Sequence, residues 1–538
     1  MKNTMLVLSA CLVVTFCGRA AAMPPEASAI FEKAGVSLTD TDLYRVAEIY
    51  NFWEQKGETI WPGMHISTTP IQFIFPEKLD VLIGSAKPPE NCVKQEVKLP
   101  GFGKTFCHRP DRKFLHGAAT GREGGDLAVS VNTMEVFDEY VNGLIQKQTP
   151  GAEKFEKPYL MYLGEVAHEL THAYQHYEAR NLPAKEKTGP LKMTKVDYPY
   201  QDGEACLLLG LEGRILSDIM DEENPGKVKE LWRDFMAVRS ERRGRLPGDL
   251  AQVENFMELS EGTAQYVGWS VQYGKNDEVK PLPQLAGDPR FGGYSSSDTL
   301  RVMLKQQLGT LELPVQSQWM RYVYTTGTAL AYNLEKAVPG WKKGLFRKVS
   351  WSKTGLADLL TANVKRSGSD KKRLEAVHSR YDAAKLKAGI KEALDKDLAG
   401  NKVKLDKFYA APGKRVSFSF AGAKPEEVMV LGPVLLTEYG KLRVFEAGAT
   451  QVAHKLGEKD ENSVHFAKAL PLLIDRATGR LELALPDGAA PAVKAGKTVV
   501  KDGRTVYSGG VEYDNGIFKW KGEKLEVVEK DGITALTF

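Results

Sequence analysis

The sequence has few of the residues that mark several specialised classes of protein. Only five of its 538 residues are cysteine, which excludes a small disulfide-built scaffold. Lysine and arginine (73) nearly balance aspartate and glutamate (69), and basic runs occur only at 239–245 and 365–373. We therefore expect solvated basic surfaces and no nucleic-acid partner. Beyond the N-terminus no apolar stretch reaches the roughly 20 residues of a transmembrane helix, so we expect no membrane-spanning segment.

The first 22 residues have the pattern of a secretory signal peptide. Lys2 precedes a short apolar run at Met5–Phe16, and Ala20–Ala22 offers a small-residue cleavage site. We predict that residues 1–22 are removed and that the mature protein is exported, either to a periplasm or to the medium. Leu8–Cys11 resembles a lipoprotein cleavage box, but almost no apolar run precedes it, so we favour the unlipidated form.

The five cysteines divide by position. Cys11 and Cys17 lie in the predicted signal peptide. Cys92 and Cys107 are close together, with a glycine- and proline-containing segment between them, and in an oxidising compartment we expect them to form a disulfide. Cys206 lies in the apolar run ACLLLGL, which indicates a buried free thiol.

The one stretch that holds three of the nine histidines carries a recognisable metal pattern. His168-Glu169-Leu170-Thr171-His172 is an HExxH sequence within an apolar-periodic segment that predicts a helix over 157–181. Residues four apart lie one turn apart on the same helix face, so both histidines can bind one Zn²⁺ while Glu169 acts as a general base. A chance HExxH on an ordinary amphipathic helix is the alternative. His176 follows one turn later, and we expect it to be a partly exposed helix residue.

Residue spacing alone does not identify the third zinc ligand. The long HExxHxxGxxH form is absent, since Gln175 and Glu178 replace its glycine and last histidine. A carboxylate from a later helix is the natural completion. The candidates are Glu204, Glu212, Glu254, Glu258 and Glu261. The last three follow i, i+4, i+7 spacing and are expected on one helix face, so geometry does not choose among them.

A second motif favours Glu261. Met257–Trp269, MELSEGTAQYVGW, resembles the Glu-Gly-x-Ala segment that follows HExxH in gluzincin metallopeptidases of the thermolysin and aminopeptidase-N type. The resemblance covers roughly Leu127–Trp341 and implies that Glu261 binds zinc. It also implies that the small residue after it lets this helix approach the zinc helix, with Glu258 as an acceptor for a histidine ring.

The same resemblance suggests two further features. Aminopeptidase-type gluzincins stabilise the oxyanion with a tyrosine from a later helix, and Tyr324 in the helix predicted at Trp319–Ala337 is our candidate. A core role for Tyr324 is the alternative, because aromatic residues at helical spacing commonly pack inside. Gluzincins also carry a substrate-binding edge strand before the zinc helix. Leu127–Asn132 occupies the corresponding place, although an ordinary internal strand fits equally well.

Changes in sequence pattern predict an α+β protein. We divide it into a mixed N-terminal part of the catalytic region with an edge strand (23–155), a mainly helical zinc-metallopeptidase-like core (156–400) and a separate all-β domain (401–538). The last division follows from short β-branched runs separated by Asp-Gly and Asn-Gly turns.

The predicted function is that of an exported zinc metallopeptidase acting on a peptide or protein substrate. Two alternatives stay open. One is a gluzincin-like binding protein without turnover, against which the retained Glu169 argues. The other is a zinc hydrolase of non-peptide amides or esters. Oligomeric state is not readable from the sequence.

Overall fold

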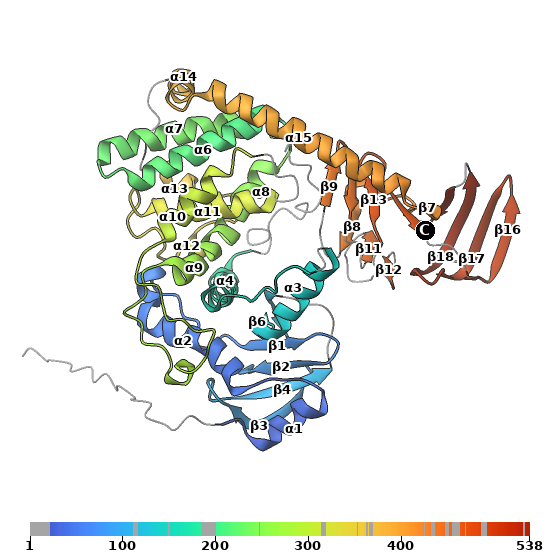
Figure 1. The fold of residues 1–538 in the computed structure, drawn as a ribbon, viewed down its shortest axis with the longest axis horizontal. Coiled ribbons are helices and arrows are strands. Elements are labelled where there is room, and N and C mark those ends of the chain that lie inside the picture. The colour runs from blue at the N-terminus through green and yellow to red at the C-terminus, as the bar shows by residue number, and fades with distance from the viewer. Residues whose placement is uncertain are drawn as a thin grey trace, which may run out of the picture. The chain divides into compact units, whose positions relative to one another are not determined.

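The computed structural model describes most of the chain. The described residues are 22–110, 117–148, 151–183, 199, 201–246, 248–313, 319–351, 353–361, 364, 369–423, 425–431, 436–446, 451–454, 463–467, 470–485, 492–530 and 533–538. The predicted signal peptide, apart from Ala22, lies outside them, as do Cys11 and Cys17. The described part has mixed α and β structure with a sheet-rich C-terminal region, which confirms the predicted α+β class (Figure 1).

The chain forms two compact units. One contains the residues up to Arg180 together with Ala264–Leu300, and the other contains Asn181–Thr263 and Arg301–Phe538. The chain therefore crosses from one unit to the other between Thr263 and Ala264, inside a helical segment. The domain limits predicted from the sequence stay predictions.

A six-stranded sheet underlies the first unit. Its strands run in the order β3-β4-β2-β1-β6-β5, with β1 parallel to β6 and the other pairs antiparallel. Their bounds are β1 (Ile71–Phe75), β2 (Leu79–Ile83), β3 (Val93–Leu99), β4 (Lys104–Pro110), β5 (Ala118–Glu123) and β6 (Asp126–Val131). The sequence predicts the first two as mainly apolar runs separated by Pro76-Glu77-Lys78, and both are fully buried because both of their faces are covered.

Of the two possibilities left open for Leu127–Asn132, the edge strand is wrong and the internal strand is confirmed. The strand expected at Leu127–Asn132 is β6, which lies between β1 and β5 and is therefore internal. Among the described strands, β5 forms this end of the sheet. The pattern AATGRE of β5 has little apolar alternation, which is why sequence periodicity did not indicate it.

The predicted disulfide between Cys92 and Cys107 is present, with the Cα atoms 5.5 Å apart. The segment between the two cysteines is a strand pair, β3 and β4, and not the loop suggested by its glycines and prolines. Both cysteines are buried against Leu82 and Ala128 of the same sheet. Cys206 is a buried free thiol, as predicted.

The first unit also contains helices, of which the first and fourth contact strands of this sheet. They are α1 (Pro25–Lys33), α2 (Asp40–Ile60), α3 (Met134–Gln148), α4 (Tyr159–Glu178) and α9 (Thr263–Tyr273), whose first residue belongs to the other unit, with 3-10 turns η1 (Ala179–Asn181) and η4 (Pro283–Leu285). α4 contains the HExxH sequence. It packs on β5, β6 and α2, and Leu163, Val166 and Leu170 on its inner face are fully buried.

The second unit begins with a helical part. Its helices are α6 (Gly203–Asp221), α7 (Pro225–Gly244), α8 (Leu250–Met257), α10 (Leu300–Gly309, whose first residue belongs to the other unit), α11 (Trp319–Leu334), α12 (Leu345–Lys348), α13 (Asp358–Thr361), α14 (Asp370–Arg380) and α15 (Ala383–Ala410). α8 continues without a break into a π-helical turn, η3 (Glu258–Gly262), and then into α9. The sequence predicts one helix over Leu250–Tyr273, and the chain is helical over this whole range, with a wider turn inside it.

The C-terminal strands form one branched sheet. They are β7 (Lys414–Ser419), β8 (Val428–Leu431), β9 (Leu436–Tyr439), β10 (Leu442–Phe445), β11 (Gln451–His454), β12 (Ser463–Phe466), β13 (Leu472–Asp475), β14 (Arg480–Leu485), β15 (Ala492–Lys494), β16 (Lys497–Lys501), β17 (Arg504–Asp514), β18 (Phe518–Lys530) and β19 (Ile533–Thr537), with a 3-10 turn η6 (Pro425–Glu427). Phe418, Phe518 and Trp520 are large buried residues of its hydrophobic core. Leu405 and Phe408 of α15 pack on β10 and β13 and join this sheet to the helical part.

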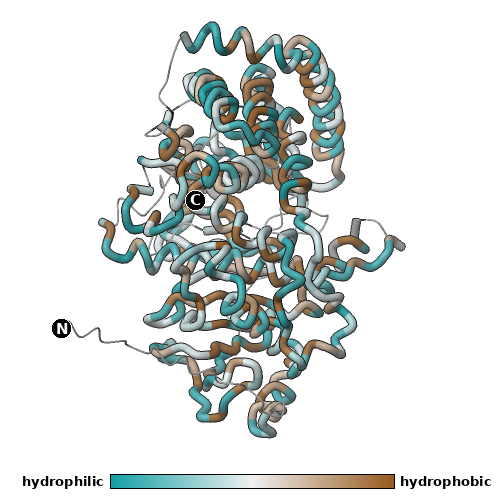
Figure 2. The backbone as a smooth tube through the Cα atoms, turned by 90° about the vertical axis from the view of Figure 1, so that its left-hand side faces the viewer, coloured by the Kyte–Doolittle hydropathy of each residue, from teal (hydrophilic) through white to brown (hydrophobic). Residues whose placement is uncertain are grey.

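Hydrophobic residues occur in short runs that alternate with hydrophilic ones along the chain. Figure 2 shows brown and teal segments alternating over the helices and strands. Within the described residues, none of the helices combines the length and apolarity needed to cross a bilayer.

Candidate metal centre

The two motif histidines face each other from successive turns of α4. Their Nε2 atoms are 3.0 Å apart. Two nitrogens bound to one tetrahedral zinc at roughly 2.05 Å would be about 3.3 Å apart, so the rings need to separate only slightly to share an ion. Both residues are half-buried, which leaves a route for solvent and a ligand.

Gln175 fixes the orientation of the second ring. Its Oε1 lies 2.9 Å from Nδ1 of His172, and the Gln175 side chain is fully buried one turn further along α4. An amide oxygen only accepts hydrogen bonds, so this contact favours the tautomer of His172 that has its proton on Nδ1. The lone pair is then on Nε2, the atom that faces His168, as a metal ligand requires. The sequence showed Gln175 only as a departure from the longer motif.

Glu261 is the third potential metal ligand. Ligand atoms of His168, His172 and Glu261 all lie within 4.8 Å of one another, an arrangement able to hold a metal ion. Glu261 belongs to the π-helical turn η3, three residues before Ala264 of α9.

A close helix crossing brings α9 onto α4. A Cβ atom added to Gly268 would lie 2.6 Å from the carbonyl oxygen of Gly164 and 3.4 Å from Cβ of His168. A Cβ added to Gly164 would lie 2.8 Å from the carbonyl oxygen of Gly268. Only glycine at both positions permits this approach, and Gly164 is one helical turn before His168.

The small residue that follows Glu261 has a different partner from the one expected. An added Cβ on Gly262 would meet backbone atoms of Gly327 at 2.5 and 2.7 Å and of Thr328 at 3.2 Å, all from α11. The expectation that Gly262 lets its helix approach the zinc helix is therefore wrong. Gly268 has that role, and Gly262 instead admits α11 against the π-helical turn.

The carboxylate of Glu169 is anchored from the sheet. The Thr120 hydroxyl on β5 lies 2.8 Å from Oε2 of Glu169 and 2.6 Å from its backbone carbonyl oxygen. Glu169 is half-buried, next to His168 in the chain. The hydroxyl shares its one proton between these two acceptors, and its contact with the carboxylate limits rotation of the Glu169 side chain, so β5 and α4 together orient the predicted base.

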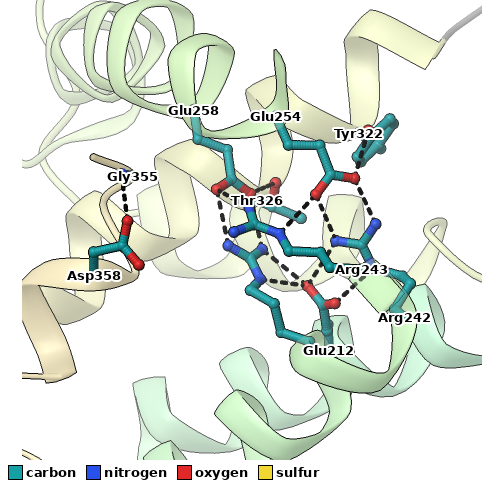
Figure 3. Close-up of polar contacts among 10 residues, drawn as sticks. Glu212, Arg242, Arg243, Glu254, Glu258, Tyr322, Thr326, Gly355 and Asp358 are labelled. Carbon is teal, nitrogen blue, oxygen red and sulfur yellow. Dashed lines mark hydrogen bonds and ion pairs between the residues drawn. The ribbon is translucent and has the colours of Figure 1, made fainter. Parts of the chain in front are cut away.

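The remaining carboxylates of the later helix belong to a buried ion network (Figure 3). Arg239 donates to both oxygens of Glu258, each at 2.8 Å, and the Thr326 hydroxyl donates to Glu258 at 2.6 Å. Glu254 pairs with Arg242 and Arg243 and accepts from the Tyr322 hydroxyl. The expectation that Glu258 supports a histidine ring is therefore wrong, because arginine and threonine hold its carboxylate.

The expectation of a single face for Glu254, Glu258 and Glu261 is also wrong. The first two point to the arginines of α7, while Glu261 points to the histidines. A π-helical turn advances fewer degrees per residue than an α-helix, so three residues after Glu258 the chain has not come back to the same side. Nothing in the local sequence indicates this wider turn.

The arginines keep the buried carboxylates of this network ionised. Burial alone would raise the pKa of Glu254, but Arg242 and Arg243 outweigh it and lower the pKa to about 2. Burial likewise opposes ionisation of Glu212, and Arg239 and Arg242 lower its pKa below the ordinary value. Glu212 thus pairs with arginine, as expected for a carboxylate that is not a ligand. Glu204 pairs with Lys387 at the surface.

Three other predicted residues have defined places. His176 is exposed on α4, as expected. Tyr324 is half-buried on α11, the helix that packs on the turn carrying Glu261. Tyr322 is buried and bonded to Glu254, which assigns it to the ion network.

Comparisons with protein-family models, curated proteins and solved structures give no match to this chain.

Proposed function

We propose that this chain is a zinc-dependent metallopeptidase of the gluzincin type. The observation that carries the proposal is the grouping of His168, His172 and Glu261 within 4.8 Å, next to Glu169. Two imidazoles and one carboxylate are a donor set typical of a catalytic zinc site, in which the fourth position is left for water. The 3.0 Å separation of the imidazole nitrogens is compatible with this set.

The side chains would divide the chemistry as follows. Zinc, when bound, lowers the pKa of a water molecule and polarises a carbonyl group. Glu169 accepts the proton that the attacking water loses and delivers it to the leaving amine. Thr120 keeps the Glu169 carboxylate oriented for both transfers, and Gln175 keeps the lone pair of His172 directed at the ion. We propose that Tyr324 stabilises the oxyanion, on the basis of the family resemblance.

The position of β5 supports a peptide substrate. Thr120 lies at the third residue of this end strand and contacts Glu169. An extended peptide can add to such an edge through main-chain hydrogen bonds, whereas a small amide or ester has no backbone to pair. This observation favours peptide hydrolysis over hydrolysis of non-peptide amides or esters.

We also propose that the protein acts outside the cytoplasm. The disulfide between Cys92 and Cys107 supports this location, because such bonds persist in oxidising compartments. The signal-peptide pattern of residues 1–22 points the same way.

Metal analysis followed by digestion of a broad peptide library tests the proposal. We expect about one zinc per chain, cleavage of the library, and loss of cleavage with a chelator. The Glu261→Gln variant should lose zinc affinity far more than Glu258→Gln, after correction for any loss of folding. Zinc binding without cleavage of any peptide would favour the binding-protein alternative, and cleavage that resists chelation would contradict the proposal.

A further inference from the structure

We propose that Arg239 is a positioning residue that aims Glu261 at the metal, acting through Glu258 and the π-helical turn. The inference rests on the proposed function, because it concerns the geometry of the same site. Arg239 touches neither the metal ligands nor a reacting atom in this account. It holds the first residue of the turn in which Glu261 lies.

The contact between Arg239 and Glu258 has a fixed geometry. Two parallel hydrogen bonds of 2.8 Å join the guanidinium to the two carboxylate oxygens, and both side chains are buried, at 4% and 0% exposure. The same guanidinium donates to Glu212 of α6 through Nε at 2.9 Å. A planar fork held at three points allows little rotation, so the start of the turn is tied to α6 and α7.

The end of the turn is held by α11. Gly327 of α11 lies so close to the turn that an added Cβ would meet the Glu258 carbonyl oxygen at 2.8 Å and Cα of Gly262 at 2.7 Å. The Thr328 hydroxyl donates to the carbonyl oxygen of Gly262 at 3.2 Å. Thr326, on the same helix, donates to the Glu258 carboxylate. Glu261 therefore lies between two anchored residues.

The need for these anchors follows from helix geometry. In a regular α-helix, Glu261 would be displaced only about 60° from Glu258 around the axis, toward the arginine face. The wider π turn carries it away from that face, toward His168 and His172. π-helical turns are rare and give up the regular hydrogen-bond register, so outside contacts must hold them. Arg239 supplies the contact at the residue where the turn begins.

Arg242 provides a matched comparison. It is also buried and also pairs with Glu212, but its second partner is Glu254 in the regular part of α8. Loss of the guanidinium fork at either position should therefore lower stability, whereas only Arg239 is tied to the π turn. Lysine keeps the charge at both positions and removes the two-point geometry.

The experiment compares Arg239→Lys and Arg242→Lys in the full-length mature protein. Three quantities are measured: thermal stability without metal, Zn²⁺ affinity by chelator competition, and the visible absorption of the Co²⁺-substituted protein. We expect similar losses of stability. Only Arg239→Lys should lose zinc affinity, on the order of 10–100-fold as for other residues that orient metal ligands, and alter the Co²⁺ bands.

A second pair of variants, with smaller changes, tests the inference if the arginine variants do not fold. Thr326→Val removes the hydroxyl that donates to Glu258 at nearly constant volume, and Thr325→Val changes the adjacent buried threonine. We expect weaker zinc binding and altered Co²⁺ bands in Thr326→Val alone. Unchanged affinity and bands in both Arg239→Lys and Thr326→Val, or equal losses in the matched controls, would overturn the inference and leave the proposed function intact. A wild-type protein that binds no zinc would instead overturn the proposed function.

Discussion

Substitution of Gly268 by alanine should separate α9 from α4 and weaken the metal site. The added Cβ would lie 2.6 Å from the Gly164 carbonyl oxygen, where ordinary contacts begin near 3.4 Å. The obstructing atom is backbone, so the helices must move apart by about 0.8 Å, because no flexible side chain can yield. Metal–ligand distances tolerate about 0.2 Å, and His168 lies one turn from the obstruction. We expect a loss of zinc affinity on the order of 10–100-fold.

The stability of this variant provides a second measure. Overpacking costs about 1–3 kcal/mol and outweighs the gain of roughly 1 kcal/mol that alanine brings to a helix. Gly143→Ala is the control, since Gly143 lies in α3 with no atom within 4 Å of an added Cβ and should gain stability. Chelator competition and denaturant unfolding measure both effects. A Gly268→Ala protein with wild-type zinc affinity and no loss of stability would refute the role of this helix crossing.

Three further predictions follow from particular contacts. Thr120→Val should lower kcat about tenfold with zinc content unchanged, since Glu169 loses an orienting hydrogen bond; an unchanged kcat would show that the contact is dispensable. Replacing Cys92 and Cys107 by alanine should lower stability by about 3 kcal/mol through a loop of 15 residues, and peptide mapping that finds two free thiols in the native protein would contradict the disulfide. Glu254 has a folded-state pKa of about 2 against 4.5 in the unfolded chain, so its contribution of about 3 kcal/mol is complete above pH 4.5 and lost as the pH falls toward 2. Denaturant unfolding at pH 7 and pH 3 should therefore show a smaller decrease in Glu254→Gln than in the wild type, by about 2 kcal/mol, whereas equal decreases would contradict the assignment.

The parts of the fold that the sequence predicted are those with strong local periodicity. β1 and β2 are mainly apolar runs bounded by turns, and α6 carries an apolar stripe after the cap Asp202. β5 was missed because its burial is partial and its residues small and polar. Which strand lies at the edge of a sheet depends on how the strands pair, and the local sequence does not contain that information. For the same reason Leu127–Asn132 could be predicted as a strand, while the choice between the edge and the interior of the sheet stayed open.

The candidate site was predictable to the extent that it lies within a single helix turn. The i, i+4 spacing placed His168 and His172 on one face of α4, and the structure brings them together. Glu261 was chosen by resemblance, because spacing alone left it equivalent to Glu258. What separates the two residues is a π-helical turn stabilised by α7 and α11, and no pattern in residues 258–262 encodes those long-range contacts.

The most direct test of the central claim is a paired measurement on Glu169→Gln. Zinc content and the rate of peptide cleavage are determined on the same purified sample, alongside the wild type. Glu169 is placed beside the ligands and is not one of them, so the variant should retain its zinc and lose roughly 10²–10⁴-fold in rate. Cleavage at the wild-type rate would contradict the assigned mechanism, and loss of zinc together with activity would show that Glu169 instead maintains the site.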